Sequence, residues 1–195
     1  MCSTVKLAAP LLAAVLTASA VGASAQSYGS GTEAPMTTPM TDAAKTARAK
    51  QTVRDFLEGL ETKDMDRVNG VWAENAVQEM PYAPQGVGFS STVVGRDALI
   101  AQYAGWPDTA GETNFTDELV FHETGNPNML IAEYRGLTEV VPTGRTYDQR
   151  YIGVYTFDDA GKIVRFREYF NPNVFTYAFD MGEDTRTSSG DGGGN

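Results

Sequence analysis

The sequence predicts an α+β fold, in which helices pack against an antiparallel sheet. Apolar residues recur at helical spacing mainly before residue 110, and from residue 115 onward the pattern is that of β-strands. Two alternating runs, 147–157 and 162–170, flank an acidic turn that contains Gly161, which is typical of a long antiparallel hairpin. Helices followed by a strand meander favour an α+β architecture.

The beginning of the chain predicts export. Residues 1–25 contain Lys6, an apolar run and small residues, which is the pattern of a cleavable secretory signal. We expect cleavage after Ala25, with Ala20 as the second candidate site. An uncleaved anchor is the alternative, but the run is short and rich in alanine for a membrane span. The mature protein is therefore expected to be periplasmic or secreted, with no membrane contact after cleavage.

Flexible segments are expected on both sides of one domain. Residues 26–41 are rich in Ser, Gly, Thr and Pro, which indicates a flexible linker. Residues 181–195 form a polar, Gly- and Ser-rich tail that is expected to be disordered. Residues 42–180 remain as one compact domain of ordinary size.

The composition argues against several classes of partner and chemistry. The chain has 195 residues, a net charge of −10 and a single cysteine. Cys2 would be removed with the signal, which leaves neither a disulfide nor a thiol nucleophile. An acidic protein repels phosphate backbones, so nucleic acid is not an expected partner. With one histidine and no cysteine in the mature chain, we expect no metal and no cofactor.

Three helices are predicted before the main strands. The first begins at Thr41 or Asp42, ends near Glu61, and is expected to lie over a sheet. A second, short helix follows Asp64, and a third begins at Gly95. The residues expected to face inward are, helix by helix, Val53, Phe56, Leu57 and Leu60; Val68, Val71 and Trp72; and Leu99, Ile100 and Tyr103.

Two short strands and four long ones are predicted. One short strand ends before Pro81, and the other covers residues 92–94. An apolar segment after Pro172 is expected to form a short helix or cover. The four long strands cover residues 115–123, 129–141, 147–157 and 162–170.

One acidic residue interrupts an apolar strand face. Alternation places Val164, Phe166, Glu168 and Phe170 on the same face of the last strand. An unpaired charge in such surroundings is costly, and the pKa of the carboxyl group rises. Glu168 is therefore the leading candidate for acid/base chemistry. The alternative is a satisfied ion pair, or a residue at the strand end that reaches water.

Aromatic residues on the preceding strand predict a cavity wall. Tyr151, Gly153 and Tyr155 share one face and are expected to line a cavity together with Phe166, although such a stripe also fits plain core packing. His122 is expected at the surface or at an interface. The opposite, charged face is expected to be solvated or to form a dimer surface; it carries Glu133, Arg135, Arg150, Arg165 and Arg167.

Four segments of the sequence resemble a known family: WAENAVQEMPYAP, VVGRDAL, PTGRTYDQRYIGVYTF and GKIVRFREYFNP. They are similar to the SnoaL-like branch of the nuclear transport factor 2 and ketosteroid isomerase superfamily, over about residues 43–180. The resemblance implies a cone-shaped, curved antiparallel sheet wrapped around three N-terminal helices, a cystatin-like α+β barrel with a pocket in its mouth. It also implies a homodimer formed through the sheet.

The resemblance does not include a complete set of isomerase catalytic residues. Phe56, Met80 and Gly153 fall where a ketosteroid isomerase-like enzyme has its oxyanion tyrosine, a carboxylate and an aspartate. Steroid-type isomerisation is therefore disfavoured, unless Glu79 substitutes from the position beside Met80. In the pattern of limonene epoxide hydrolase-like enzymes Glu168 matches the final carboxylate, but most of the water-activating set is missing.

A resemblance to phenazine-pathway proteins gives Glu168 an acid/base role. The partner histidine of that group falls near Asp117, which shares a strand face with Leu119 and Phe121 in the predicted strand. Two carboxyl groups in an apolar pocket raise the pKa of one of them, so that one can donate a proton while the other accepts.

Two functions remain open from the sequence. The first is an exported enzyme of isomerase, cyclase or hydrolase type, in which Glu168 is the acid/base, Asp117 or Glu79 is the second carboxylate, and Tyr134 or Tyr151 is the hydroxyl donor. The second is a non-catalytic ligand-binding or dimerisation module. In both, a small, largely apolar molecule is the expected ligand. The residues expected to line its pocket are Tyr134, Tyr151, Tyr155, Phe166, Phe56 and Met80.

Overall fold

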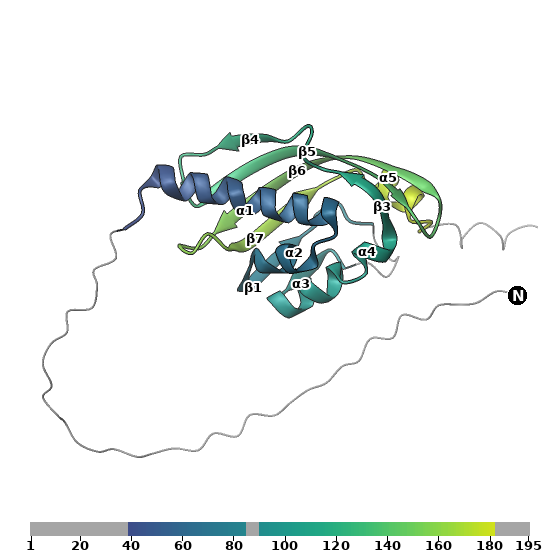
Figure 1. The fold of residues 1–195 in the computed structure, drawn as a ribbon, viewed down its shortest axis with the longest axis horizontal. Coiled ribbons are helices and arrows are strands. Elements are labelled where there is room, and N and C mark those ends of the chain that lie inside the picture. The colour runs from purple at the N-terminus through teal and green to yellow at the C-terminus, as the bar shows by residue number, and fades with distance from the viewer. Residues whose placement is uncertain (1–38, 85–89, 182–195) are drawn as a thin grey trace, which may run out of the picture. The chain divides into compact units, whose positions relative to one another are not determined.

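The computed structural model describes residues 39–84 and 90–181, and it confirms the α+β architecture. Seven strands form one sheet in the order β2-β1-β7-β6-β5-β3, with β4 also paired to β5 (Figure 1). The predicted signal peptide, most of the linker and nearly all of the tail lie outside the described residues. The helices are α1 (Asp42–Thr62), α2 (Met65–Gly70), α3 (Arg96–Tyr103), α4 (Trp106–Thr109) and α5 (Pro172–Ala178). The strands are β1 (Trp72–Glu79), β2 (Thr92–Val94), β3 (Ala110–Asn114), β4 (Val120–Glu123), β5 (Met129–Val140), β6 (Arg145–Phe157) and β7 (Ile163–Tyr169).

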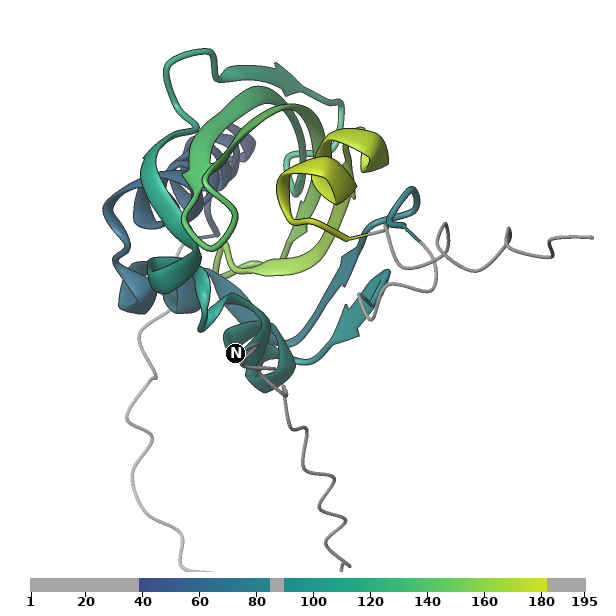
Figure 2. The same ribbon diagram turned by 90° about the vertical axis from the view of Figure 1, so that its right-hand side faces the viewer.

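The sheet curves strongly, and its inner face encloses the core. The end-on view in Figure 2 shows the long strands bending around an interior, with α5 beside one rim. Only the β1–β7 pair is parallel among the described strands, and the other pairs are antiparallel. Within this part of the chain, no helix combines the length and apolar character that a membrane crossing requires.

Helix α1 confirms the predicted stripe and cap. The Thr41 hydroxyl accepts a hydrogen bond from the Ala44 N–H at 3.2 Å, which satisfies a free amide of the first turn. Lys63 ends the helix in a left-handed conformation, with φ at 59°. The residues of the predicted stripe are all buried, namely Val53, Phe56, Leu57 and Leu60.

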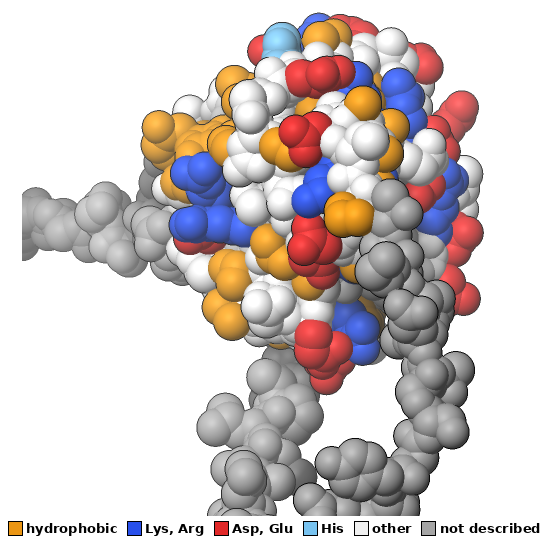
Figure 3. Space-filling model, turned by 90° about the vertical axis from the view of Figure 1, so that its left-hand side faces the viewer, with side chains coloured by type: hydrophobic (Ala, Val, Ile, Leu, Met, Phe, Trp, Pro, Cys, Tyr) orange, Lys and Arg blue, Asp and Glu red, His pale blue; other side chains and the backbone are white. Residues whose placement is uncertain are grey.

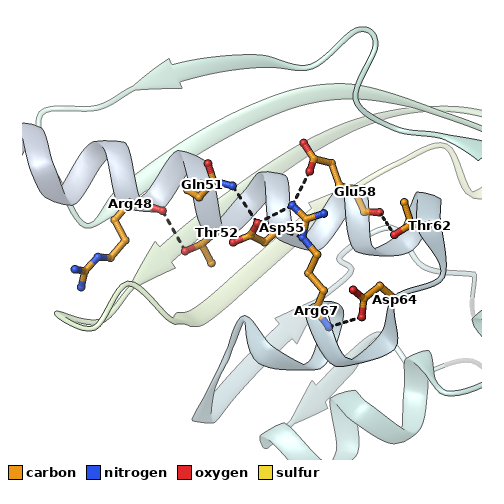
Figure 4. A network of polar contacts seen from close by, with 8 residues as sticks. All are labelled: Arg48, Gln51, Thr52, Asp55, Glu58, Thr62, Asp64 and Arg67. Carbon is orange, nitrogen blue, oxygen red and sulfur yellow. Dashed lines mark hydrogen bonds and ion pairs between the residues drawn. The ribbon is translucent and has the colours of Figure 1, made fainter.

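Helix α2 crosses α1 at close range and is held there by charge pairs. A Cβ on Gly59 would lie 2.9 Å from Cγ2 of Val68, so only glycine permits this approach. Arg67 donates to Asp55 at 2.8 Å and to Glu58 at 2.5 Å, as Figure 4 shows. The short α2 therefore has a defined position against α1 despite having few residues of its own.

The predicted strand 115–123 is wrong in its boundaries. The structure has β3 and β4 on either side of a turn, and β3 was not predicted. The reason is Glu61 of α1, whose carboxylate accepts hydrogen bonds from the backbone N–H of Phe115 and from the N–H and hydroxyl of Thr116. Amides that bond to Glu61 cannot join a strand ladder. A second shift of boundary places Trp72 at the start of β1 rather than in the second helix, although it is buried as expected.

The β6–β7 hairpin confirms the central prediction but contains a bulge. Gly161 has φ at 77°, the left-handed conformation that the turn requires. The register changes between the pairs Thr156–Arg165 and Phe157–Ile163, so β7 has one extra residue there. Ile163, rather than Val164, therefore points into the core on the face of Phe166, and the alternation predicted for that end of the strand is wrong.

Charged side chains cover the outside of the domain. Acidic and basic side chains are interspersed at the end seen in Figure 3. Several of them pair between elements, as Lys45 does with Asp159 at 2.9 Å and Lys50 with Glu123 at 2.6 Å. Exposed pairs of this kind add little to stability. The apolar interior is therefore the main source of stability for the fold.

Candidate functional site

The inner face of the sheet carries a continuous group of aromatic rings. Tyr134 of β5 stacks on Tyr151 of β6, with ring centroids 4.8 Å apart. Tyr155 of β6 stacks on Phe166 of β7, with centroids 4.4 Å apart. All four side chains are buried. Strand alternation places these predicted cavity residues on one face, as the sequence indicated.

Residues from the helices and from β1 complete this aromatic interior. Phe56 of α1 makes edge contacts with Trp72, Tyr103 and Phe166, with ring centroids 5.3 to 5.8 Å away. Met80, directly after β1, is 2% exposed. The six predicted lining residues are therefore all buried in the interior. The interior is suited to a flat or apolar molecule rather than to a highly charged one.

Glu168 is the acidic residue of this inner face. It lies opposite Gly153 in the β6–β7 ladder, two pairs along from the stacked Tyr155 and Phe166 and therefore on the same face. Its Oε1 accepts a hydrogen bond from the Tyr134 hydroxyl at 3.2 Å, and its Oε2 accepts one from the Gln78 amide at 3.1 Å. Both donors are neutral. Within the described residues, no cation forms an ion pair with Glu168, so the ion-pair alternative fails here.

The surroundings raise the pKa of Glu168 to about 7. Burial is the largest cause, because a carboxylate loses its hydration in the aromatic interior. The hydrogen bonds from Tyr134 and Gln78 oppose this shift, since they stabilise the charged form. The residue as a whole is partly exposed, but its carboxyl group lies in the interior. Near neutral pH the carboxyl group can therefore both release and take up a proton.

A second polar layer stands behind Glu168. Oε1 of Gln78 accepts hydrogen bonds from Nε2 of Gln102 at 2.8 Å and from the Tyr103 hydroxyl at 3.0 Å. Both donors belong to α3, and Gln78 itself is 1% exposed. A buried amide with both ends bonded is fixed in orientation. The chain from α3 to β5 thus runs Gln102, Gln78, Glu168 and Tyr134.

Gly153 makes room for a tyrosine at the site. A Cβ on Gly153 would lie 2.5 to 2.8 Å from the ring and hydroxyl of Tyr155. The Tyr155 hydroxyl therefore occupies space next to Glu168, the cross-strand partner of Gly153. This oxygen is buried, and within the described residues no hydrogen bond of ordinary geometry reaches it. An unsatisfied buried hydroxyl is a group that a polar atom of a ligand or a water could satisfy.

Neither predicted second carboxylate lies beside Glu168. Glu79 is on the outer face of β1, where Arg165 donates to both of its oxygens at 2.8 Å and lowers its pKa. Asp117 is exposed in the turn between β3 and β4. Glu79 faces outward because side chains alternate along a strand and its neighbour Gln78 lies on the inner face. The reason for Asp117 is the interruption of the strand by Glu61.

A groove along the central strands is lined by side chains from both faces of the sheet. Its volume is about 700 Å³. Tyr134 and Tyr151 contribute to its lining, while the exposed Val120 and Ile152 supply apolar surface. The remaining lining residues are Tyr82, Glu118, Glu133, Arg150, Tyr169 and Phe170. Glu168 is not among the lining residues, although Tyr134, Tyr151 and Phe170 of the buried interior are.

The other sequence candidates lie away from the interior. His122 is at the surface, as expected, and its Nε2 lies 3.1 Å from Oε1 of Glu133. Arg135 points outward and pairs with Asp148 at 2.7 Å. In the part of the chain that the structure describes, no group of three His, Cys, Asp or Glu side chains is arranged to hold a metal ion.

Sequence reasoning missed Gln78 and Gln102. A signal for Gln78 was present, because Ala76, Gln78 and Met80 alternate as a buried face with one polar member, the same pattern that identified Glu168. The resemblance directed attention instead to Glu79, beside Met80, whose side chain lies on the opposite face of the strand. No local pattern marked Gln102, since its role depends on how α3 packs against β1.

A curved, mainly antiparallel sheet packed around N-terminal helices is the fold of the nuclear transport factor 2-like proteins. The model of the SnoaL-like domain matches residues 53–166, and the chain belongs to this family. Solved structures of proteins described as NTF2-like share the same fold. The resemblance to this superfamily is confirmed.

Relatives of known sequence support the same assignment. The uncharacterized protein YesE of Bacillus subtilis (strain 168) is 36% identical over 132 residues, which cover 68% of this chain and 87% of that protein. An uncharacterized PhzA/B-like protein of Pseudomonas aeruginosa is 31% identical over 124 residues, covering 64% of this chain and 84% of that protein. A crystal structure from Bacillus subtilis, provisionally described as an isomerase, has a TM-score of 0.65 and 34% identity, and covers 71% of this chain and 96% of its own.

Proposed function

We propose that this protein binds a small, largely apolar molecule in the aromatic interior and performs acid/base chemistry on it with Glu168. The observation that carries the proposal is the buried carboxyl group, whose pKa is raised to about 7 and whose hydrogen-bond partners are neutral. A carboxyl group that only stabilises the fold is usually paired with a cation, and its pKa is then low.

The residues around Glu168 take defined roles in this proposal. Glu168 transfers the proton, and Tyr134, whose hydroxyl lies 3.2 Å from Oε1, orients the carboxyl group and supplies a hydroxyl beside it. Tyr155 offers a buried hydroxyl that can bind an oxygen of the ligand. Stacked rings hold a flat ligand by contact. With a single carboxyl group in place, the reaction moves one proton between two positions of the same molecule.

The reaction class that fits is isomerisation or cyclisation rather than hydrolysis. Hydrolysis by this fold needs a set of groups that hold and activate water, whereas the two nearest charged candidates, Glu79 and Arg135, face outward in ion pairs. Isomerase is also the description of one similar structure. That description belongs to the other protein, and here it supports the choice of assay.

The experiment that tests this proposal is native mass spectrometry of the mature protein purified from cells that export it. A small-molecule mass that is present under gentle conditions and lost on denaturation would support the pocket and define the ligand class. The ligand is then offered to wild type and to two variants, Glu168→Gln and Glu79→Gln. The proposal expects proton exchange or product formation to fail in Glu168→Gln and to persist in Glu79→Gln, whose side chain lies on the opposite face.

The alternative function is a module without catalysis. The observation that favours it is that both oxygens of Glu168 already accept hydrogen bonds, from Tyr134 and Gln78, as expected for a structural group. In that case the ligand would bind equally well to Glu168→Gln, and no proton of the ligand would exchange with deuterated water faster than in buffer.

We also propose that the protein is exported and that it forms a homodimer. The signal-like residues 1–25 support a periplasmic or secreted location, which N-terminal sequencing of the exported protein tests directly. The groove, with the exposed apolar side chains of Val120 and Ile152, supports a second copy of this chain as its occupant. Arg150 and Glu133 line it together, so a two-fold contact can bring each arginine to the glutamate of the other copy.

A further inference from the structure

The Gln78 side-chain amide, which lies beside Glu168, is held in one orientation by its hydrogen bonds. Its Oε1 accepts two hydrogen bonds from α3, at 2.8 Å from Gln102 and at 3.0 Å from Tyr103. An amide oxygen has two lone pairs, so both are in use. The amide nitrogen is therefore the end that faces Glu168, and it donates to Oε2 at 3.1 Å.

We propose that Gln78 is a positioning residue, held by Gln102 and Tyr103, that keeps Oε2 of Glu168 as an acceptor and places the acidic proton on Oε1, beside Tyr134. A protonated carboxyl group has one carbonyl oxygen and one hydroxyl oxygen. The carbonyl oxygen is the better hydrogen-bond acceptor. The N–H of Gln78, whose orientation is fixed, therefore favours Oε2 as the carbonyl oxygen of protonated Glu168. Oε1 faces the Tyr134 hydroxyl, which can accept a proton as well as donate one.

The neighbouring titratable groups leave this arrangement undisturbed near neutral pH. Five tyrosines interact electrostatically with Glu168 or bond to it. Burial raises the pKa of each of them above the ordinary value, so they remain neutral while Glu168 titrates. They are Tyr103 of α3, Tyr134 of β5, and Tyr147, Tyr151 and Tyr155 of β6. A proton that leaves Oε1 therefore meets the Tyr134 hydroxyl first.

The competing arrangement has the Gln78 amide turned by half a rotation. Its carbonyl would then accept the acidic proton from Oε2, and its N–H groups would donate to the oxygens of Tyr103 and Gln102. Both arrangements satisfy all the hydrogen bonds. They differ in which oxygen of protonated Glu168 is the carbonyl, and infrared spectroscopy measures the strength of the hydrogen bond to that oxygen.

The test is an infrared difference spectrum of the full chain between about pH 5 and about pH 9, on either side of the pKa of Glu168. The carbonyl band of the protonated group is assigned by its loss in Glu168→Gln. The proposal expects this band to move to higher wavenumber in Gln78→Leu and to keep its position in Tyr134→Phe, because only Gln78 donates to the carbonyl oxygen. A band that moves in Tyr134→Phe and stays in Gln78→Leu would overturn it.

A second measurement tests the role of α3, which has no contact with Glu168 in the proposal. In the double variant Gln102→Leu, Tyr103→Phe, the Gln78 amide is released, and the pKa of Glu168 rises by about one unit as the donor to its carboxylate is lost. The conservative single variant Tyr103→Phe gives a smaller rise if the double variant does not fold. Thr138→Val is the control, because it removes a buried hydroxyl contact at 2.8 Å between Thr138 and Thr113, away from the site.

An unchanged carbonyl band and an unchanged pKa in folded Tyr103→Phe would also overturn the proposal, since a merely structural role of α3 predicts both. The inference rests on the proposed function only for its catalytic meaning. Both measurements are made without a substrate, so their failure would leave the proposed chemistry standing, and a failed activity assay would leave the proton position established.

Discussion

At the scale of single residues, the site is defined by what surrounds Glu168. The carboxyl group sits among aromatic rings with two neutral donors, and burial raises its pKa to about 7. Glu79 has the same chemistry but faces outward to Arg165, and its pKa is lowered instead. The pKa values of these two glutamates thus shift in opposite directions, because the side chains lie on opposite faces of the sheet and have different hydrogen-bond partners. Of the two, only Glu168 can exchange a proton near neutral pH.

The raised pKa of Glu168 predicts how stability depends on pH. The folded state binds the proton more tightly than the unfolded state, where the ordinary value is 4.5. The stabilisation is therefore complete below about pH 4.5 and is lost as the pH rises through about 7, by up to about 3 kcal/mol. Urea denaturation at pH 5 and at pH 8 measures the difference for wild type and for Glu168→Gln. Equal slopes with pH in the two proteins would contradict the prediction.

The close approach at Gly153 predicts a second residue-scale effect. Gly153→Ala places a Cβ about where the Tyr155 ring already lies, 2.5 Å from its nearest atom. We expect a loss of about 1–3 kcal/mol in the free energy of unfolding, because the ring must shift in a packed interior. Gly105→Ala is the matched control, since no atom lies within 4 Å of a Cβ there. Thermal unfolding of both variants checks this, and similar losses would refute the steric explanation.

At the scale of elements, one helix decides where a strand stops. Glu61 of α1 accepts the amides of Phe115 and Thr116, which ends β3 and turns the chain toward β4. α3 acts in a similar way on the site, since Gln102 and Tyr103 hold the Gln78 amide of β1. Helices in this fold therefore do more than cover the sheet, because their polar side chains set strand ends and side-chain orientation.

The contact between α1 and the β3–β4 turn is open to a direct test. Glu61→Ala leaves two backbone amides and one hydroxyl without an acceptor, and we expect a loss of about 1–3 kcal/mol in stability. Hydrogen exchange at Phe115 and Thr116 should accelerate at the same time. Glu58→Ala is the control on the same helix, because it removes only a partly exposed ion pair with Arg67, worth about 1 kcal/mol or less. Unchanged exchange in Glu61→Ala would show that the turn is held by other contacts.

At the scale of the whole molecule, the two faces of the sheet carry different kinds of side chain. The inner face holds the aromatic interior and Glu168, and the outer face holds paired charges and the exposed Val120 and Ile152, which line part of the groove. A surface with exposed apolar residues between opposite charges is suited to a symmetric contact. Because Tyr134 also lines the groove, the proposed dimer would contact a residue that bonds to Glu168.

The proposed dimer predicts a concentration-dependent mass. Ile152→Glu places a charge on an exposed apolar position that lines the groove, and we expect it to shift the protein from dimer to monomer in sedimentation equilibrium. Val94→Glu is the control, since Val94 of β2 is also an exposed apolar residue but does not line the groove. Wild type that sediments as a monomer at all concentrations would remove the dimer from the proposed function.

The sequence by itself determined the fold class, the first helix with its cap and stripe, the long hairpin, and the place of Glu168 among aromatic residues. These features depend on periodicity, capping and turn residues, which are local properties of the chain. Tertiary structure alone decided the bulge that turns Ile163 inward, the turn held by Glu61 that leaves Asp117 outside the site, and the contacts of Gln78 with Gln102 and Glu168. Each of these depends on contacts between residues far apart in the sequence, such as Gln78 with Gln102 and Glu168, and such contacts leave no spacing pattern in the chain.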